Sequence, residues 1–238
     1  MGSLHHESLD FYLTPEHECS YLPSRQAMTL FADPSVCVNT DLYSELIQYG
    51  FRRSGTHVYR PRCSNCDACI PIRVPVNNFA TSRSQRRVWK RNQDLSITAV
   101  AAEYNDEHFQ LYRRYMSTRH AGGGMDTPEP EKYSEFLINP DIDARFYEFR
   151  LNRQLLAVAA VDMLNDGISA VYTFFDPAES ARSLGGMAIL WQIEEARRLN
   201  IPYVYLGYWI KECQKMVYKD QYRPFEVFQE GHWQIYEK

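Results

Sequence analysis

The feature that most restricts the fold is a run of three strand-like segments joined by tight turns in the second half of the chain. The two turns are Asn152-Arg153 and Asn165-Asp166-Gly167, and a helix and one more strand follow the run. The expected elements are strands at 145–151, 155–163 and 168–175, a helix at 185–199 and a strand at 203–207. This order predicts an α+β fold in which helices pack on a mostly antiparallel sheet.

The other segments of the chain are shorter and less regular. Residues 1–38 are expected to be mostly irregular, and the glycine-rich segment 121–130 is expected to be a long loop. The remaining expected elements are a helix from Thr40 or Asp41 to Gly50, a hairpin at 51–53 and 57–59, a cysteine knuckle leading into a strand at 63–75, a helix from Ser82 or Ser84 to about Asn92, a strand at 95–102, a helix at 105–119 and a hairpin at 225–228 and 233–236. The expected boundary near residues 100–105 gives a smaller N-terminal domain at 1–102 and a C-terminal domain at 103–238.

Size and composition place the chain among globular proteins. Of its 238 residues, 45% are apolar and 24% are charged, which excludes disordered and fibrous classes. The longest apolar run, Leu155 to Val161, is too short to cross a bilayer, and the first residues show no secretory signal. We therefore expect a cytoplasmic protein with no membrane partner, in which the six cysteines are thiols or metal ligands and not disulfides.

Positive charge is concentrated in one window, although the net charge of the chain is −4. Between Arg52 and Arg91 the only acid is Asp67, so that this window carries +9 and the rest of the chain −13. The ten basic residues are Arg52, Arg53, Arg60, Arg62, Arg73, Arg83, Arg86, Arg87, Lys90 and Arg91. The run has too few acids for pairing along a helix, so it favours a local phosphate-binding surface over a solvated helix face.

Three cysteines at two-residue spacing form the cysteine knuckle. Cys63, Cys66 and Cys69 could converge on one metal ion, because thiolates bind zinc at about 2.3 Å. Cys19 is the best candidate for a fourth ligand, and Cys37 is the reserve. The spacing alone does not choose between zinc, an iron–sulfur cluster and three ordinary thiols in a turn.

The loop before the predicted helix at 185–199 carries two glycines, Gly185 and Gly186. Bare backbone amides at a helix N-terminus bind phosphate or another anion, and acetyl-CoA-dependent transferases use a glycine turn at this point. Here Met187 stands where those enzymes need a small residue. The turn therefore favours the fold of such enzymes more than their cofactor, and the alternative is a helix start with glycines for close packing.

An aromatic segment with three lysines follows the last strand of this unit. Lys211, Lys215 and Lys219 would share one helical stripe, and the aromatic residues around them are Tyr205, Tyr208, Trp209, Tyr218 and Tyr222. Such a segment could stack on a base and hold a phosphate. The alternative is an aromatic core edge with lysine stems lying along it.

Several of these pieces together resemble the bacterial aspartate/glutamate leucyl-tRNA–protein transferases, the prokaryotic branch of the arginyl-tRNA–protein transferase superfamily. The matching stretches are CSYLP at 19–23, GFRRSG at 50–55, YRPRCSNCDACIPIRVPV at 59–76, SRSQRR at 82–87, RH at 119–120, YTFFDP at 172–177, SLGG at 183–186 and LGYWIKECQKMVYK at 206–219. Each stretch alone is weak, and all of them in this order are specific.

The resemblance implies an enzyme that moves leucine from leucyl-tRNA to the α-amine of proteins beginning with Asp or Glu, which marks them for degradation by the N-end rule. It also implies a GNAT-like acyltransferase domain that uses aminoacyl-tRNA in place of acetyl-CoA, preceded by the cysteine-containing domain. No cofactor is required for the chemistry, and the family's cysteines leave zinc or an iron–sulfur cluster possible at Cys19, Cys63, Cys66 and Cys69. The expected partners are leucyl-tRNA and the acidic acceptor proteins, with no DNA and no membrane.

Within this reading, each candidate residue receives a predicted role. The tRNA phosphates would be held by Arg83, Arg86, Arg87, Lys90, Arg91, Lys215 and Lys219. Tyr172 and Tyr208 would line the reaction centre as hydrogen-bond partners, and the acceptor carboxylate would be bound by Arg119 or His120, with Arg73 as second choice.

Two other functions fit part of the sequence. An acetyl-CoA-dependent acetyltransferase would explain the glycine turn but not Met187. A non-enzymatic RNA-binding or zinc-knuckle module would explain the basic window and the cysteines, but it leaves the regular second half without a purpose.

Overall fold

The computed structural model describes residues 9–119 and 128–237. The helices are α1 (Thr40–Gln48), α2 (Arg83–Arg91), α3 (Asp106–Arg119), α4 (Pro130–Leu137) and α5 (Leu184–Arg198), with short 3₁₀ helices η1 (Pro177–Arg182) and η2 (Val217–Gln221). The strands are β1 (Phe11–Leu13), β2 (His17–Glu18), β3 (Gln26–Ala27), β4 (Thr29–Ala32), β5 (Arg52–Ser54), β6 (His57–Pro61), β7 (Ile70–Pro75), β8 (Ser96–Ala101), β9 (Ala144–Leu151), β10 (Gln154–Met163), β11 (Gly167–Phe175), β12 (Tyr203–Trp209), β13 (Glu226–Gln229) and β14 (His232–Ile235).

The centre of the molecule is a large mixed sheet with the order β14-β13-β7-β12-β11-β10-β9-β8. Within the described residues, all neighbouring strands of this sheet are antiparallel except β11 and β12, which are parallel. A smaller sheet, β1-β4-β6-β5, lies beside it, and β2 pairs with β3. The predicted α+β class with a mostly antiparallel sheet is therefore confirmed.

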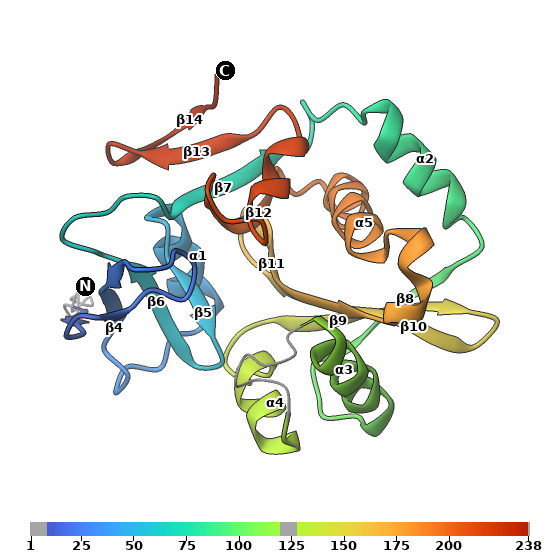
Figure 1. Ribbon diagram of the computed structural model, residues 1–238, viewed down its shortest axis with the longest axis horizontal. Coiled ribbons are helices and arrows are strands. Elements are labelled where there is room, and N and C mark those ends of the chain that lie inside the picture. The colour runs from blue at the N-terminus through green and yellow to red at the C-terminus, as the bar shows by residue number, and fades with distance from the viewer. Residues whose placement is uncertain (1–8, 120–127, 238) are drawn as a thin grey trace, which may run out of the picture.

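Helices cover both faces of the large sheet (Figure 1). On one face, α5 buries Leu190 and Ile193 against Val204 and Ile168 of the sheet, and α2 packs beside α5. On the other face, α3 and α4 bury Tyr112 and Tyr133 against Phe174. A third core lies between α1, the small sheet and the large sheet.

The segment before α1 is mostly irregular in its described part, as the sequence predicts, but it also contains strands that were not predicted. These are β1 to β4, which take up the smaller part of residues 9–38. These strands are only two to four residues long, and their partners are distant in sequence, as in the pairing of Phe31 with Tyr59. Short strands of this kind carry too little periodicity to be recognised in the sequence.

Two further helices were not predicted, and one strand is longer than expected. Pro130 was placed in the glycine-rich loop but begins α4, where proline is favoured because its missing N–H has no helical partner. The 3₁₀ helix η1 connects β11 to α5, and β12 continues from Gly207 to Trp209.

The predicted domain boundary near residues 100–105 stays a prediction. The large sheet takes strands from both sides of that point, since β7 pairs with β12 and β8 pairs with β9. In the part of the chain that the structure describes, no helix has the length and apolar character needed to span a bilayer.

Candidate active site

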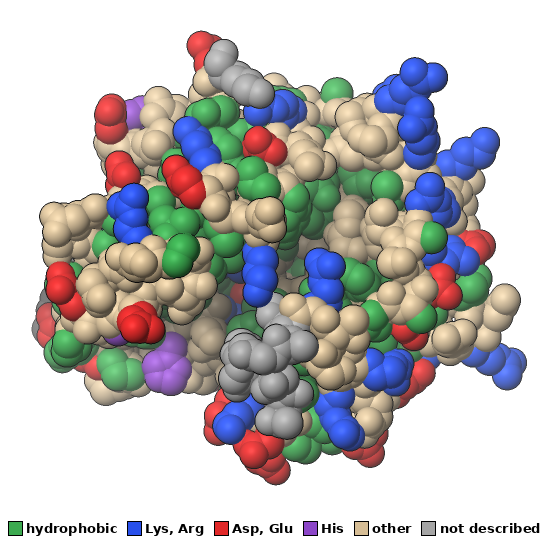
Figure 2. Space-filling view, in the orientation of Figure 1, with side chains coloured by type: hydrophobic (Ala, Val, Ile, Leu, Met, Phe, Trp, Pro, Cys, Tyr) green, Lys and Arg blue, Asp and Glu red, His purple; other side chains and the backbone are tan. Residues whose placement is uncertain are grey.

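The basic helix α2 presents its cations to solvent. Its start is fixed by a capping box, in which the Ser82 amide donates to Gln85 Oε1 at 2.8 Å and the Gln85 amide donates to Ser82 Oγ at 3.3 Å. The predicted tRNA-binding residues Arg83, Arg86, Arg87, Lys90 and Arg91 are all exposed. In the space-filling view, Lys and Arg side chains gather over α2 at the upper right (Figure 2).

The buried side of α2 joins it to the elements around the start of α5. Gln85 Nε2 donates to the Gln221 carbonyl of η2 at 3.0 Å, and Asn92 Nδ2 donates to the Arg182 carbonyl at 2.9 Å. The helix also packs directly against α5. The basic surface is therefore held rigidly next to the C-terminal part of the chain, as the sequence prediction requires.

The N-terminus of α5 is open. Its first residues follow Ser183, which has a left-handed backbone with φ of 55°, and among the described residues no side chain caps the helix. A Cβ added at Gly186 would meet only the Tyr222 hydroxyl, at 3.8 Å, whereas one at Gly185 would approach the Phe175 ring. Met187 is buried in the core. Free backbone amides beside a basic helix form a suitable place for an anion.

A wedge opens between β11 and β12, immediately beside this end of α5. The two parallel strands pair only over Gly167–Ser169 and Tyr203–Tyr205. Beyond that point β11 continues along β10 to Phe175 and β12 continues along β7 to Trp209, so that each strand follows a different neighbour. Residues 170–175 of β11 and 206–209 of β12 form the two sides of this wedge.

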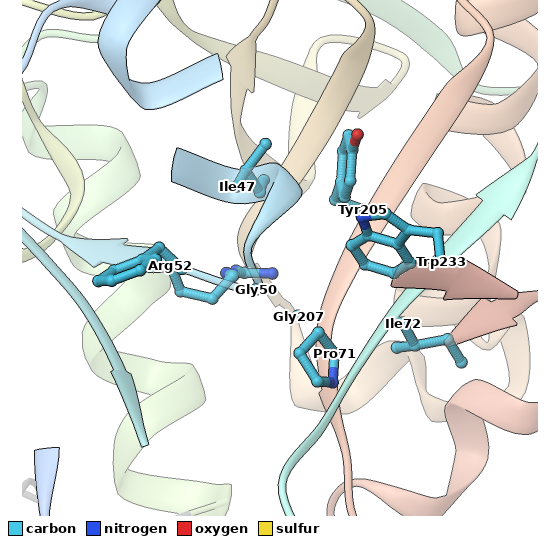
Figure 3. Close-up of a pocket in the computed structure, with 9 residues that line it drawn as sticks. Ile47, Gly50, Arg52, Pro71, Ile72, Tyr205, Gly207 and Trp233 are labelled. Carbon is cyan, nitrogen blue, oxygen red and sulfur yellow. The ribbon is translucent and has the colours of Figure 1, made fainter. Parts of the chain in front are cut away.

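Arg52 of β5 occupies the closed end of the wedge. Its Nη2 donates to the Ala170 carbonyl of β11 at 2.8 Å, directly after the last residue of β11 that pairs with β12. On the other strand, Gly207 has φ of +80°, and a Cβ there would lie 2.4 Å from Arg52 Nη1. Figure 3 shows the guanidinium group pointing toward Gly207, across a small pocket from Tyr205 and Trp233.

Lys219 does not lie at the surface, although the sequence analysis predicts that it binds a phosphate of the tRNA. It is 7% exposed, and its Nζ donates to the Tyr208 carbonyl at 2.6 Å and contacts Met216 Sδ at 3.3 Å. Burial, together with the smaller effect of the positive charge of Arg52, lowers the pKa of Lys219 to about 7. The three lysines share no helical stripe, because residues 210–216 form turns and only 217–221 form a 3₁₀ helix. Lys215 is exposed.

Tyr172 lies on the side of the wedge formed by β11 and α3. Its hydroxyl donates to Met116 Sδ at 3.5 Å, and its ring packs edge-on against Tyr112, Tyr115 and Phe136. Burial raises the pKa of Tyr172, so this phenol is a neutral hydrogen-bond donor near pH 7. Its predicted role at the reaction centre stays a prediction.

Arg119 ends α3 with an exposed side chain close enough to Tyr172 to act on its pKa. Arg119 therefore remains a candidate for binding the acceptor carboxylate. His120 lies outside the described residues.

Two predicted site residues are engaged elsewhere in the fold. The Tyr208 hydroxyl lies within hydrogen-bond distance of two carbonyls, those of Gly50 at 2.9 Å and Tyr59 at 3.3 Å, and the residue is 5% exposed. Arg73 is 7% exposed, and its Nε donates to Glu226 Oε2 at 2.6 Å while its guanidinium group stacks 3.7 Å from the Tyr203 ring centroid. The structure does not bring either side chain together with Tyr172 and Arg119, because both hold the sheets together.

The cysteines of the knuckle gather around Cys69. Burial raises the pKa of Cys69 to about 12, and the neighbouring thiols of Cys19, Cys63, Cys66 and Cys213 raise it in the same direction. The reserve ligand Cys37 is exposed and interacts with Asp141 instead. In residues 9–119 and 128–237, however, no three His, Cys, Asp or Glu side chains are arranged to hold a metal ion. The donor types suit a soft metal and the geometry does not, so a metal at Cys19, Cys63, Cys66 and Cys69 stays a prediction.

The sequence prediction missed two residues that the structure brings to these sites. Cys213 joins the thiols from the segment after β12, and it has no spacing relation to the C-x2-C-x2-C motif that could have revealed it. Arg52 was counted in the basic window but received no role. Its tandem with Arg53 was the only available signal, and two adjacent strand residues point to opposite faces, so that a tandem alone does not say which one is free.

Comparisons with known proteins agree on one family. The family model "Arginine-tRNA-protein transferase, N terminus" matches residues 17–87, and "Arginine-tRNA-protein transferase, C terminus" matches residues 107–229. A protein of Pseudomonas putida named aspartate/glutamate leucyltransferase is 54% identical over 225 residues, covering 94% of this chain and 96% of that protein. A protein of the same name from Hahella chejuensis is 51% identical over 226 residues, covering 95% and 97%.

Among solved structures, the crystal structure of FemX is similar to this chain with a TM-score of 0.53 and 10% sequence identity. The similarity covers 87% of this chain and 71% of that chain. At this identity the likeness concerns the fold alone.

Proposed function

The chain belongs to the arginine-tRNA–protein transferase family, and we propose that it moves leucine from leucyl-tRNA to the α-amine of proteins whose first residue is Asp or Glu. One observation carries the proposal: relatives that are 51–54% identical over at least 94% of the chain are named aspartate/glutamate leucyltransferase. The product would feed degradation by the N-end rule, and the place of the reaction would be the cytoplasm.

The chemistry needs alignment more than activation. The leucyl ester of the tRNA is already activated, and an α-amine with a pKa near 8 is partly neutral at pH 7. The amine nitrogen attacks the ester carbonyl, an amide bond forms, the ester bond to the terminal ribose breaks, and a proton passes from the amine to the leaving ribose hydroxyl. Correct alignment of the two reactants is worth about 7–11 kcal/mol, so no metal or cofactor is assigned to a step.

The donor side of the site is α2 with the start of α5. The five exposed cations of α2 suit the acceptor-stem phosphates, since non-specific phosphate contacts need Lys and Arg on one side of a fold. The uncapped start of α5 at Gly186 suits the phosphates near the 3′ end, because backbone amides there are free to donate. The wedge between β11 and β12 then lies beside the 3′ end, where the ester would be placed.

The divided parallel pair, with a glycine turn and helix α5 between its two strands in the chain, supports a GNAT-like acyltransferase domain. In this arrangement the acyl group lies between the separated strands, and Tyr172 would donate to the ester carbonyl or to the ribose hydroxyl from the β11 side. Arg119 would face the acceptor from the end of α3.

The test uses the purified full chain with radiolabelled leucyl-tRNA or arginyl-tRNA and peptides that begin with Asp, Glu, Lys or Ala. We expect leucine transfer to the Asp and Glu peptides only. Transfer of arginine in preference to leucine, or equal transfer to the Lys peptide, would contradict the proposed substrates. Acetylation of the same peptides from acetyl-CoA, without any transfer from tRNA, would replace the proposal with an acetyltransferase.

A further inference from the structure

Two cations inside the molecule lack a carboxylate partner. Arg52 Nη1 is buried and has no hydrogen-bond partner among the described residues, and Arg52 Nη2 donates to a backbone carbonyl. Lys219 Nζ likewise donates to a backbone carbonyl, that of Tyr208. Buried charges are ordinarily paired, because removing a charge from water costs several kcal/mol. The cation pair Arg52 and Lys219 therefore requires an explanation.

The neighbouring arginines show what this fold does with structural cations. Arg53 donates to both carboxylate oxygens of Asp162 from a fully buried position. Arg73 donates to Glu226 and stacks on aromatic rings. Both are neutralised by acids of this chain, whereas no ion pair in the described part of the chain involves Arg52 or Lys219.

The surroundings of the pair leave its charge uncompensated. Arg52 is close enough to Asp162 for its charge to act on that carboxyl group, but both oxygens of Asp162 accept hydrogen bonds from Arg53. Arg52 also acts on Tyr208 and Tyr218, whose pKa values burial raises, so these phenols stay neutral near pH 7. The two cations repel one another, and the positive charge of Arg52 lowers the pKa of Lys219. A small anion placed between them would remove this repulsion.

The fold holds the Arg52 guanidinium in place for such an anion. The Ala170 carbonyl fixes one edge, and the missing side chain at Gly207 makes room for Nη1. Nη1 is thereby left without a hydrogen-bond partner among the described residues, and Lys219 of η2 lies close enough for the charge of Arg52 to act on it. Two donors on neighbouring side chains would match the two oxygens of a carboxylate.

The position of Arg52 separates it from the donor side. In Figure 1, β5 and α2 lie on opposite sides of β12 and α5. Phosphates held by α2 and the start of α5 therefore approach the wedge from one side, and Arg52 meets whatever enters from the other. The second reactant of an aminoacyl transfer is the acceptor, and a carboxylate is the part of an acidic acceptor that differs from other N-termini.

We propose that Arg52 and Lys219 bind the side-chain carboxylate of the acceptor's first residue, an aspartate or a glutamate. This inference rests on the proposed function for the identity of the acceptor. In this proposal the cation pair takes the role for which Arg73 was the second choice. Arg73 itself donates a hydrogen bond to Glu226. An asparagine or glutamine at the same place has no charge, so it would leave the repulsion between Arg52 and Lys219 in place.

The test compares peptides that differ only in a first residue of Asp or Asn, with wild type, Arg52→Gln, Lys219→Met and the control Arg198→Gln. Arg198 is exposed at the end of α5 and pairs with Glu195. We expect Arg52→Gln to lower kcat/KM for the Asp peptide about 100-fold, because it leaves a buried charged group unpaired, and to change the Asn peptide little. The affinity for leucyl-tRNA should be unchanged. Lys219→Met puts an apolar side chain of similar length in a buried place, so it should fold even where Arg52→Gln does not.

A second measurement distinguishes failure of this inference from failure of the proposed function. It is the binding of each peptide in the absence of tRNA, detected as thermal stabilisation of the protein. A wild-type protein that binds the Asp peptide better than the Asn peptide through Arg52, yet transfers no leucine, would support the inference and contradict the proposed function. Leucine transfer with an Asp-to-Asn preference that survives in both folded variants would overturn the inference. A weaker affinity for leucyl-tRNA in the two variants, with the preference intact, would overturn it as well and assign the cation pair to a phosphate.

Discussion

The exposed cations of α2 and the buried arginines Arg53 and Arg73 come from the same basic window of the sequence, but they lie in opposite environments. Arg83, Arg86, Arg87, Lys90 and Arg91 all face solvent on one short helix. Arg53 and Arg73 are buried, each against a carboxylate of this chain. The number of basic residues in a sequence window therefore overestimates the charge of the surface, because some of them are buried in ion pairs.

The difference between the two regions is one of energy as well as position. Exposed charges interact weakly in water and are screened by salt over about 8–10 Å, so the α2 cations act as a group on a partner with many charges. Buried charges interact strongly and are hardly screened, so each one matters individually. Exposed cations such as those of α2 are therefore suited to a polyanion, and buried ones such as Arg53 to a single partner group.

The largest change in stability is expected when one member of a buried ion pair is removed. Arg53→Met leaves Asp162 as an unpaired buried carboxylate, and we expect the free energy of unfolding to fall by about 3–5 kcal/mol. Denaturant unfolding measures this change. The double variant Arg53→Met with Asp162→Leu should recover most of the loss, because it buries two apolar groups in place of a single charge. A single variant as stable as wild type would show that the pair is not desolvated.

The second prediction concerns Lys219, whose pKa is about 7 in the folded protein and 10.5 in an ordinary environment. Between these pH values the unfolded chain binds more protons than the folded one, so this group makes stability rise with pH, by up to ~1.4 kcal/mol per pH unit. Below pH 7 both states are protonated and the cost of burial is fully present. Lys219→Met should therefore be more stable than wild type at pH 7, and the difference should shrink toward pH 10.

Denaturant unfolding of both proteins at pH 7, 8 and 9 provides the measurement. The difference between the two proteins isolates Lys219 from the tyrosines and cysteines that titrate at high pH. Parallel pH profiles would show that Lys219 keeps its ordinary pKa, and would weaken its place in the cation pair.

The sequence predicts some regions of this fold well because their signals are local. The turns at Asn152-Arg153 and Asn165-Asp166-Gly167 set the register of β9, β10 and β11, and these strands appear where they were expected. The cap of helix α2 is Ser82, one of the two residues predicted for it. In each case the residues that decide the structure lie next to one another in the chain.

The site could be predicted only in part, because its decisive partners are distant in sequence. The sequence around Arg73 does not indicate that it pairs with Glu226. The sequence around Lys219 does not indicate that its Nζ donates to the Tyr208 carbonyl. The prediction that the three lysines share one face of a helix was wrong. The segment consists of turns followed by the short 3₁₀ helix η2, so the spacing of an α-helix does not apply. The freedom of Arg52 and the commitment of Arg53 follow from Ala170, Gly207 and Asp162, which are more than 100 residues away.

The prediction with the lowest magnitude concerns the exposed cations of α2. Arg83→Ala with Arg86→Ala removes two of the proposed phosphate contacts, and we expect a roughly tenfold weaker affinity for leucyl-tRNA. The slope of log affinity against log salt should flatten by about 1.5, because each contact contributes about 0.7–0.9. A control with Lys132→Ala and Arg198→Ala removes two exposed cations from α4 and from the end of α5, and should leave the slope unchanged. An equal loss in both double variants would mean that only net charge matters, and that α2 is not the surface that tRNA contacts. A flattened slope in the α2 variant alone, with the preference for the Asp peptide over the Asn peptide unaffected, would show that donor and acceptor are held by different cations.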